Sequence, residues 1–228
     1  MDKLLDFQIE GLASPETGSP TLQLDGLTCE RGGRPLFSNI NRQLRAGDLL
    51  RVQGANGAGK TTLLRMLCGL LEPTQGHVLW NGQKINDLKE DFSRELVFLG
   101  HAAALKDDLS PLENLRVACL LGGKRIDTLA ARQALDEAGL RGHHLTPVRR
   151  LSQGQRKRSA LARLSLANQS SHPPRLWVLD EPFNALDDKA TLWLANLIKA
   201  HLQRAGIVVL TSHQDVALDS ASQQDLAL

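Results

Sequence analysis

The stretch Gly-Ala-Asn-Gly-Ala-Gly-Lys-Thr at Gly54–Thr61 decides the fold, because it fits the pattern G-x-x-x-x-G-K-[S/T]. An apolar run at 48–53 leads into it and a segment of helical character at 61–70 follows, which gives the strand–loop–helix context that the pattern needs. The glycines let successive backbone N–H groups point at one anion, and the helix N-terminus adds a partial positive charge. The stretch therefore predicts a phosphate site, with Lys60 on the β- and γ-phosphates and the hydroxyl of Thr61 on Mg²⁺. Taken alone, the pattern leaves open a glycine-rich turn before an ordinary helix.

The composition is that of a globular protein able to bury a core. Of its 228 residues, 42% are hydrophobic and 23% are charged, and the formal net charge of +2 is too small to indicate nucleic acid or an acidic membrane surface as a partner. The three cysteines form no CxxC pair, which favours packing roles in a reducing compartment. The sequence shows neither a secretory signal nor the ~20 apolar residues of a membrane span, so we expect a soluble, cytoplasmic protein.

The order of periodicities predicts an α/β fold with a mainly parallel sheet, an antiparallel β layer and an inserted α-helical subdomain. We expect a flexible N-terminal extension at 1–20 and one domain at 21–228, divided into a core of 21–98 and 168–228 and a helical subdomain of about 99–167. Strand patterns occupy 21–29, 36–44, 76–80, 176–179 and 207–210. Helical patterns occupy 112–121, 129–138, 155–167 and 188–205.

Two carboxylates follow the apolar strand Leu176-Trp-Val-Leu179. Asp180 and Glu181 then lie at the carboxyl end of a strand, where ligands bind in open α/β sheets. Asp180 suits Mg²⁺, directly or through water, and Glu181 suits polarising an attacking water. The alternative is a solvated loop start, which the phosphate loop earlier in the chain disfavours.

The segment Leu-Ser-Gln-Gly-Gln at 151–155 precedes a basic and then apolar helix. Ser152 is a natural N-cap, and the dipole of the following helix favours an anion. On physical grounds alone, the segment could equally be a capped helix start.

These stretches, together with Ala-Leu-Asp at 185–187 and Thr-Ser-His at 211–213, occur in the order that is typical of the ATP-binding cassette family, which the chain resembles from Thr21 to His213. The resemblance implies ATP and Mg²⁺ as ligands, ATP hydrolysis, a homodimer and integral membrane permease subunits as partners, and a peripheral position on the cytoplasmic face of the bacterial inner membrane. An ATP-switched module for ribosomes or DNA and a kinase are weaker alternatives. The chain has neither the second cassette of such modules nor the second-substrate lid of a kinase.

The resemblance also implies a role for individual residues. Glu181 and His213 are the catalytic residues, and Thr61 and Asp180 hold the metal. Asp187 contacts the second subunit, and the signature at Ser152, Gln153, Gly154 and Gln155 contacts the γ-phosphate held by that subunit. The nucleotide-binding residues are Gly54, Ala55, Asn56, Gly57, Ala58, Gly59, Lys60, Thr61 and Thr62.

The sequence departs from the family at two places. Arg31 occupies the position of the aromatic residue that stacks on adenine, and a guanidinium plane can also stack on a base, although an exposed turn arginine is equally compatible. His101 occupies the position of a glutamine that coordinates Mg²⁺ and senses the membrane partner, and imidazole can still hydrogen-bond or bind a metal.

The Leu-Gly-His context at 99–101, the run Leu-Asp-Glu-Pro-Phe-Asn-Ala-Leu-Asp at 179–187 and Thr-Ser-His-Gln at 211–214 are similar to the ATPase subunits of cytochrome c maturation systems, described as haem exporters. The alternative within the transport class is the ATPase of another small-molecule or lipoprotein exporter.

Overall fold

The computed structural model describes residues 19–170, 172–212, 216–218 and 222–228, so most of the expected N-terminal extension lies outside the described residues. The strands are β1 (Thr21–Arg31), β2 (Arg34–Arg45), β3 (Asp48–Gln53), β4 (Gln75–Trp80), β5 (Gln83–Lys84), β6 (Leu96–Leu99), β7 (Leu176–Leu179), β8 (Ile207–Thr211) and β9 (Ser222–Ala227). The helices are α1 (Lys60–Leu67), α2 (Ile85–Leu88), α3 (Glu90–Glu95), α4 (Pro111–Leu121), α5 (Thr128–Glu137), α6 (Gln153–Gln169) and α7 (Asp188–Gln203), with a 3₁₀ turn, η1 (Val148–Arg150).

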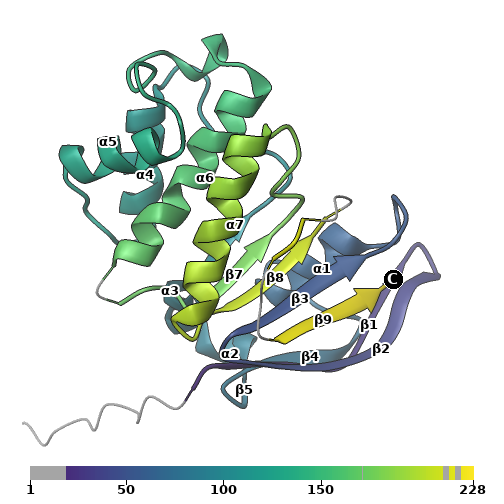
Figure 1. The fold of residues 1–228 in the computed structure, drawn as a ribbon. Helices are drawn as coiled ribbons and strands as arrows, with labels where there is room; N and C mark the ends of the chain where they lie inside the picture. The colour runs from purple at the N-terminus through teal and green to yellow at the C-terminus, as the bar shows by residue number, and fades with distance from the viewer. Residues whose placement is uncertain (1–18, 171, 213–215, 219–221) are drawn as a thin grey trace, which may run out of the picture.

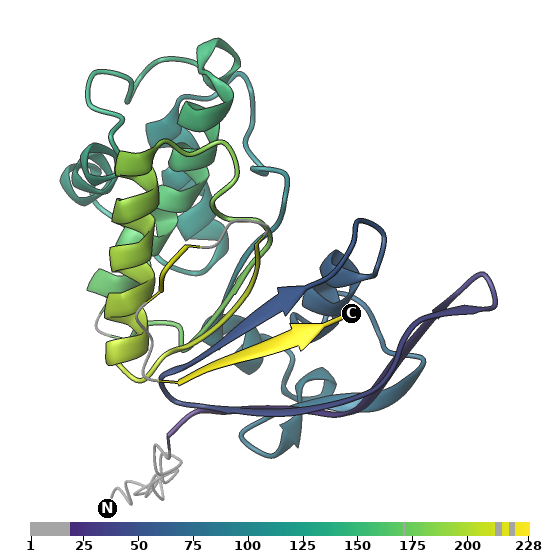
Figure 2. The same cartoon turned by 45° about the vertical axis from the view of Figure 1, so that its right-hand side comes forward.

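The strands form two sheets. An antiparallel sheet has the order β2-β1-β4-β5, and a parallel sheet has the order β6-β7-β8-β3-β9. The long β1–β2 hairpin runs beneath the parallel sheet in Figure 1, and α1 lies between the two sheets (Figures 1 and 2). This arrangement confirms the expected α/β fold with a parallel sheet, an antiparallel layer and helices.

Strands β7 and β8 of the parallel sheet are almost continuously apolar and are buried along their whole length, as expected for strands covered on both faces. In β3, Leu50 and Val52 point into a core shared with α1 and the antiparallel sheet, whereas Leu49 points into a second core. That second core lies against α6 and α7 and contains Trp177 and Phe183. Strand alternation therefore places α1 on one face and α6 and α7 on the other.

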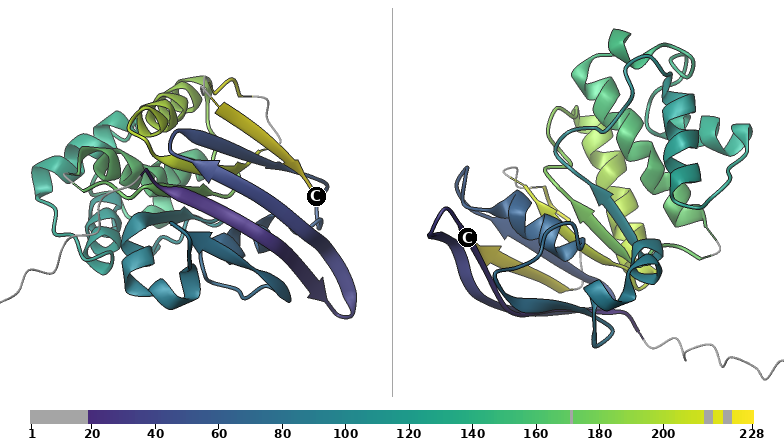
Figure 3. Two further views of the ribbon diagram at one scale, coloured as in Figure 1. Left: turned by 90° about the horizontal axis from the view of Figure 1, so that it is seen from below. Right: turned by 180° about the vertical axis from the view of Figure 1, so that it is seen from behind.

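Helices α4, α5 and α6 share a third core, built from Leu112, Leu115, Leu135, Leu140 and smaller side chains. In Figure 3 these helices form a group at one end of the molecule, away from the antiparallel sheet. Helix α6 also reaches the second core through Leu161 and Leu164. The exact division into a core at 21–98 and 168–228 and a helical subdomain at 99–167 stays a prediction.

The expected helices and strands are present with shifted ends. Helix α1 ends at Leu67, three residues before the expected Leu70. The Asn81-Gly82 turn joins β4 to β5, with both residues at positive φ as such a turn requires. The sequence analysis did not foresee β6 or β9.

A buried histidine near the end of α7 makes the stability of the fold depend on pH. His201 is 2% exposed and stacks on Trp177, with ring centroids 4.0 Å apart and an interplanar angle of 9°. Burial lowers the pKa of His201 to about 4, because an imidazolium cation loses its hydration there.

We therefore predict that the free energy of unfolding falls as the pH is lowered from about 6.5 to about 4. In that interval the unfolded chain binds a proton that the folded chain does not, and the loss reaches about 3 kcal/mol. The variant His201→Gln lacks this titrating group. Its free energy of unfolding, measured by urea denaturation, should therefore change less steeply with pH over this interval, by the slope that the uptake of one proton contributes. Parallel curves for the two proteins would contradict the assignment.

Candidate functional site

The loop at Gly54–Thr61 joins β3 to α1 and wraps around its own lysine. Lys60 is 8% exposed, and its Nζ donates to the backbone oxygens of Gly54, at 2.6 Å, and of Ala55, at 3.1 Å. A Cβ on Gly54 would lie 2.8 Å from the backbone oxygen of Leu228, and one on Gly59 would lie 3.1 Å from the ring of Phe37. Both glycines have positive φ, so packing and backbone conformation each require them.

Helix α1 begins directly after this loop. Its N-cap, Gly59, has φ of 102° and makes no side-chain cap. The first N–H groups of an α-helix have no partner within the helix, so those of Lys60, Thr61 and Thr62 are available to an anion. The loop and the helix N-terminus thus present the lysine and a row of N–H groups in one place.

Asp180 follows β7 and is the most enclosed carboxylate of the site, at 2% exposure. The hydroxyl of Thr61 donates to its Oδ2 at 2.8 Å, and the hydroxyl of Thr211 donates to its Oδ1 at 2.8 Å. Its backbone N–H donates to the carbonyl of Leu99 at 2.8 Å. Asp180 therefore ties together α1, β6 and β8.

Glu181 is held by its neighbours in a strained turn. Its φ is 47°, an uncommon value for a residue other than glycine. Its backbone N–H donates to the Thr211 hydroxyl at 2.8 Å, so this one hydroxyl serves both carboxylate residues. The side chain of Asn184 donates to Glu181 Oε2, and Nδ1 of His101 lies 3.5 Å from the same oxygen.

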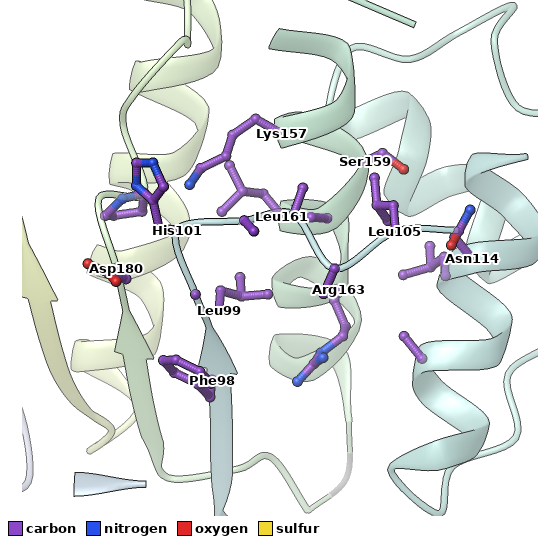
Figure 4. A pocket seen from close by; sticks show the side chains of 18 of the residues that line it. Phe98, Leu99, His101, Leu105, Asn114, Lys157, Ser159, Leu161, Arg163 and Asp180 are labelled. Atoms are coloured by element: carbon purple, nitrogen blue, oxygen red, sulfur yellow. The ribbon is translucent and has the colours of Figure 1, made fainter. Parts of the chain in front are cut away.

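A cavity of about 510 Å³ opens beside these carboxylates, between β6 and helices α4 and α6 (Figure 4). His101, Lys157 and Asp180 lie together at one end of it in Figure 4, and much of the rest of its wall is apolar. Burial lowers the pKa of Lys157, and the charges of Asp180 and Glu181 partly offset this shift. The cavity thus brings a cation close to the carboxylate pair.

The signature segment begins α6. The hydroxyl of Ser152 accepts the N–H of Gln155 at 3.2 Å, and Oε1 of Gln155 accepts the N–H of Ser152 at 2.9 Å, which is a complete capping box. Ser152 and Gln153 are exposed. A Cβ on Gly154 would lie 2.8 Å from the backbone oxygen of Ala185, so the signature packs closely against the turn before α7. Asp187 caps that helix by accepting the N–H of Ala190 at 2.8 Å.

The structure brings some of the expected residues together and not others. Thr61, Asp180, Glu181 and His101 form one connected group. Within the described part of the chain, the side-chain hydrogen bonds of the signature run among its own residues and to His143 rather than to the phosphate loop. Arg31 is exposed at the end of β1, paired across the hairpin with Arg34. His213 lies outside the described residues.

Thr211 and Asn184 were missed by the sequence analysis. Thr211 is fully buried and ends the apolar run of β8. A polar residue that closes a buried strand was a usable signal, because such a hydroxyl needs a partner. Asn184 offered no signal beyond its place three residues after Glu181.

The comparisons identify the class of protein. A family model described as ABC transporter matches residues 37–184. The fold also matches the ATP-binding cassette MJ0796 in a dimeric post-hydrolysis state bound to ADP and Pi, with a TM-score of 0.72 and 27% identity over 85% of this chain and 88% of that one. The chain belongs to the ABC transporter family, and it is a nucleotide-binding cassette of that family.

Within that family, the chain groups with a particular set of export proteins. It is 46% identical over 209 residues to the cytochrome c biogenesis ATP-binding export protein CcmA of Nitrosospira multiformis, covering 92% of this chain and 99% of the relative. It is also 46% identical to the protein of the same name from Dechloromonas aromatica, over 91% of this chain and 99% of the relative. In the described ranges, none of the helices has the length and hydropathy needed to cross a membrane.

The bridging hydroxyl of Thr211 gives a direct test of the site's architecture. Thr211→Val keeps the shape of the side chain but leaves the N–H of Glu181 and one oxygen of Asp180 without this partner. We predict a loss of about 1–3 kcal/mol in the free energy of unfolding, measured by urea denaturation. Thr211→Ser keeps the hydroxyl and is the matched control. A loss in Thr211→Ser with none in Thr211→Val would show that the methyl group, and not the hydrogen bonds, matters.

Proposed function

We propose that the chain is the ATP-hydrolysing subunit of a membrane ABC transporter complex that serves haem export and cytochrome c maturation. The observation that carries the hydrolytic role is the connected group of Thr61, Asp180, Thr211 and Glu181 beside the phosphate loop. The relatives named for cytochrome c biogenesis and export support the biological role.

We propose one step for each part of the site. Lys60 and the N–H groups at the start of α1 bind the phosphates. Glu181 accepts a hydrogen bond from Asn184 on one oxygen, with His101 beside that oxygen, and polarises the attacking water. Thr61 and Asp180 present hard oxygen atoms in contact with one another, which is the donor set that suits Mg²⁺. When bound, Mg²⁺ would neutralise charge on the phosphates. Arg31 is proposed to stack on adenine, His213 to lie near the γ-phosphate, and His101 to replace the family's glutamine.

Activity is proposed to need two copies of the chain. The signature of one subunit, Ser152–Gln155, reaches the γ-phosphate held by the other, with Asp187 at the contact between them. The exposure of Ser152 and Gln153 on one subunit is consistent with this role, and so is the dimeric state described for MJ0796.

The membrane partners are proposed to dock at the cavity beside His101, with the subunit on the cytoplasmic face of the inner membrane. The apolar wall of the cavity includes Phe98, Leu105 and Leu161, and Arg163 adds a half-buried cation. An apolar helix end carrying one acidic side chain would complement this surface. Movement of the partner would then reach Glu181 through its contact with His101.

The first test concerns the attacking water. Glu181→Gln should retain ATP binding and lower turnover by about 10² or more, because the general base is lost. The variant should accumulate as an ATP-bound dimer, measured by light scattering with bound nucleotide. Glu90→Gln, which alters a carboxylate on a side chain that is 90% exposed, is the control. Near-normal ATPase activity in Glu181→Gln would remove this residue from its role.

The second test concerns the biological role. A strain carrying Lys60→Ala should lose covalent haem attachment to periplasmic c-type cytochromes and keep its b-type cytochromes, because the phosphate site is lost while the fold remains. Haem staining of separated proteins and difference spectra measure the two classes. Lys189→Ala, an exposed lysine on α7, is the control. Normal c-type cytochromes in the Lys60→Ala strain would favour another exporter.

A further inference from the structure

The side chain of Gln155 divides its hydrogen bonds between two partners. Its Oε1 accepts the backbone N–H of Ser152 at 2.9 Å, within the capping box. Its Nε2 lies 3.2 Å from Nε2 of His143. His143 comes from the loop between α5 and η1, a part of the chain that no motif marks.

The chemistry of these atoms fixes the state of the imidazole. A backbone N–H can only donate, so the amide oxygen of Gln155 must face Ser152 and the NH₂ group must face His143. The NH₂ group is itself only a donor. Nε2 of His143 must therefore be an acceptor, which requires a neutral ring with its proton on Nδ1.

The loop that carries His143 is anchored on both sides. The backbone N–H of His143 donates to Leu140 at 2.9 Å, and its carbonyl accepts from Thr146 at 3.1 Å. The next residue, His144, is 9% exposed, and its Nε2 lies 2.9 Å from Asp136 on α5. The carbonyl of His144 accepts from Leu112 on α4 at 3.1 Å. The loop of His143 and His144 thus links the start of α6 to α4 and α5.

We propose that His143 is a positioning residue for the signature. Its neutral imidazole holds the amide of Gln155, so that the capping box fixes Ser152 and the N-terminus of α6 for the phosphate of the second subunit. Gly154 of the same segment packs against the carbonyl of Ala185, so two other parts of the chain hold the signature. This inference rests on the signature role given above.

The test uses the purified full-length chain. His143→Ala should lower kcat and the fraction of ATP-bound dimer in a Glu181→Gln background by about three- to tenfold, the factor expected for one hydrogen bond of ordinary net strength. ATP binding to the monomer should not change, because the phosphate loop is not touched. His143→Gln places an amide oxygen near the position of Nε2 and should restore both quantities, which a merely structural role would not predict.

Further variants test whether His143 and Gln155 act through the same hydrogen bond. Gln155→Ala should lose at least as much as His143→Ala, because it also removes the capping-box bond to Ser152. The double variant should be no worse than Gln155→Ala alone, because the bond to His143 is already absent there. Arg141→Ala, an exposed position of the same loop, should behave as the wild type. Additive losses, or a loss in His143→Gln equal to that in His143→Ala, would overturn the proposal.

Ser152→Arg separates this inference from the proposed function. If Ser152→Arg is inactive and His143→Ala is normal, only the positioning role fails. If Ser152→Arg is fully active, the signature role itself fails, and with it the basis for His143.

Discussion

The rest of the structure depends on one buried carboxylate and the hydroxyl groups that surround it. Asp180 would be costly to bury as an anion without partners, and Thr61 and Thr211 each donate to one of its oxygens. These residues come from the end of β7, the start of α1 and the end of β8. The same contacts that make the buried charge tolerable therefore fix the phosphate loop against the sheet and place Glu181 beside it.

Close backbone approach is the second constraint. Gly54, Gly59 and Gly154 each lie where an added Cβ would meet another segment at 2.8–3.1 Å. For the loop glycines, positive φ adds to the requirement. Gly154 has an ordinary backbone conformation, so its requirement comes only from the carbonyl of Ala185. The motifs are thus dense in glycine for two different physical reasons.

How much of the molecule the sequence could predict depended on how local the signal was. Strand β7 matched its expected bounds because a buried parallel strand is a plain apolar run. Strand β9 has the sequence Ser-Gln-Gln-Asp-Leu-Ala, buries only Leu226 and lies at the sheet edge, so it carries almost no hydrophobic pattern. The residues within the phosphate loop were predictable from spacing. His143 was not predictable, because its importance arises from a partner that is 12 residues away in the chain. Thr211 offered only the signal of a polar residue that closes a buried strand, and its partner Asp180 is 31 residues away.

Two separate sets of contacts hold the residues of the site, and the segment that follows β6 lies between them. Asp180 and Glu181 are fixed by α1 and β8, whereas the signature is fixed by the loop of His143 on the α4 and α5 side and by the turn at Ala185. The segment that leaves β6 passes between them, and its His101, 68% exposed, reaches Glu181 from the edge of the cavity. The imidazole of His101 is a rigid ring, unlike the flexible amide of the glutamine that it is proposed to replace. We expect movement of the membrane partner to affect Glu181 by displacing that ring from it. A rigid group either keeps the contact or loses it as a whole. A membrane partner docked at the cavity, as proposed above, would need only to move the 100–105 segment to change how Glu181 is held.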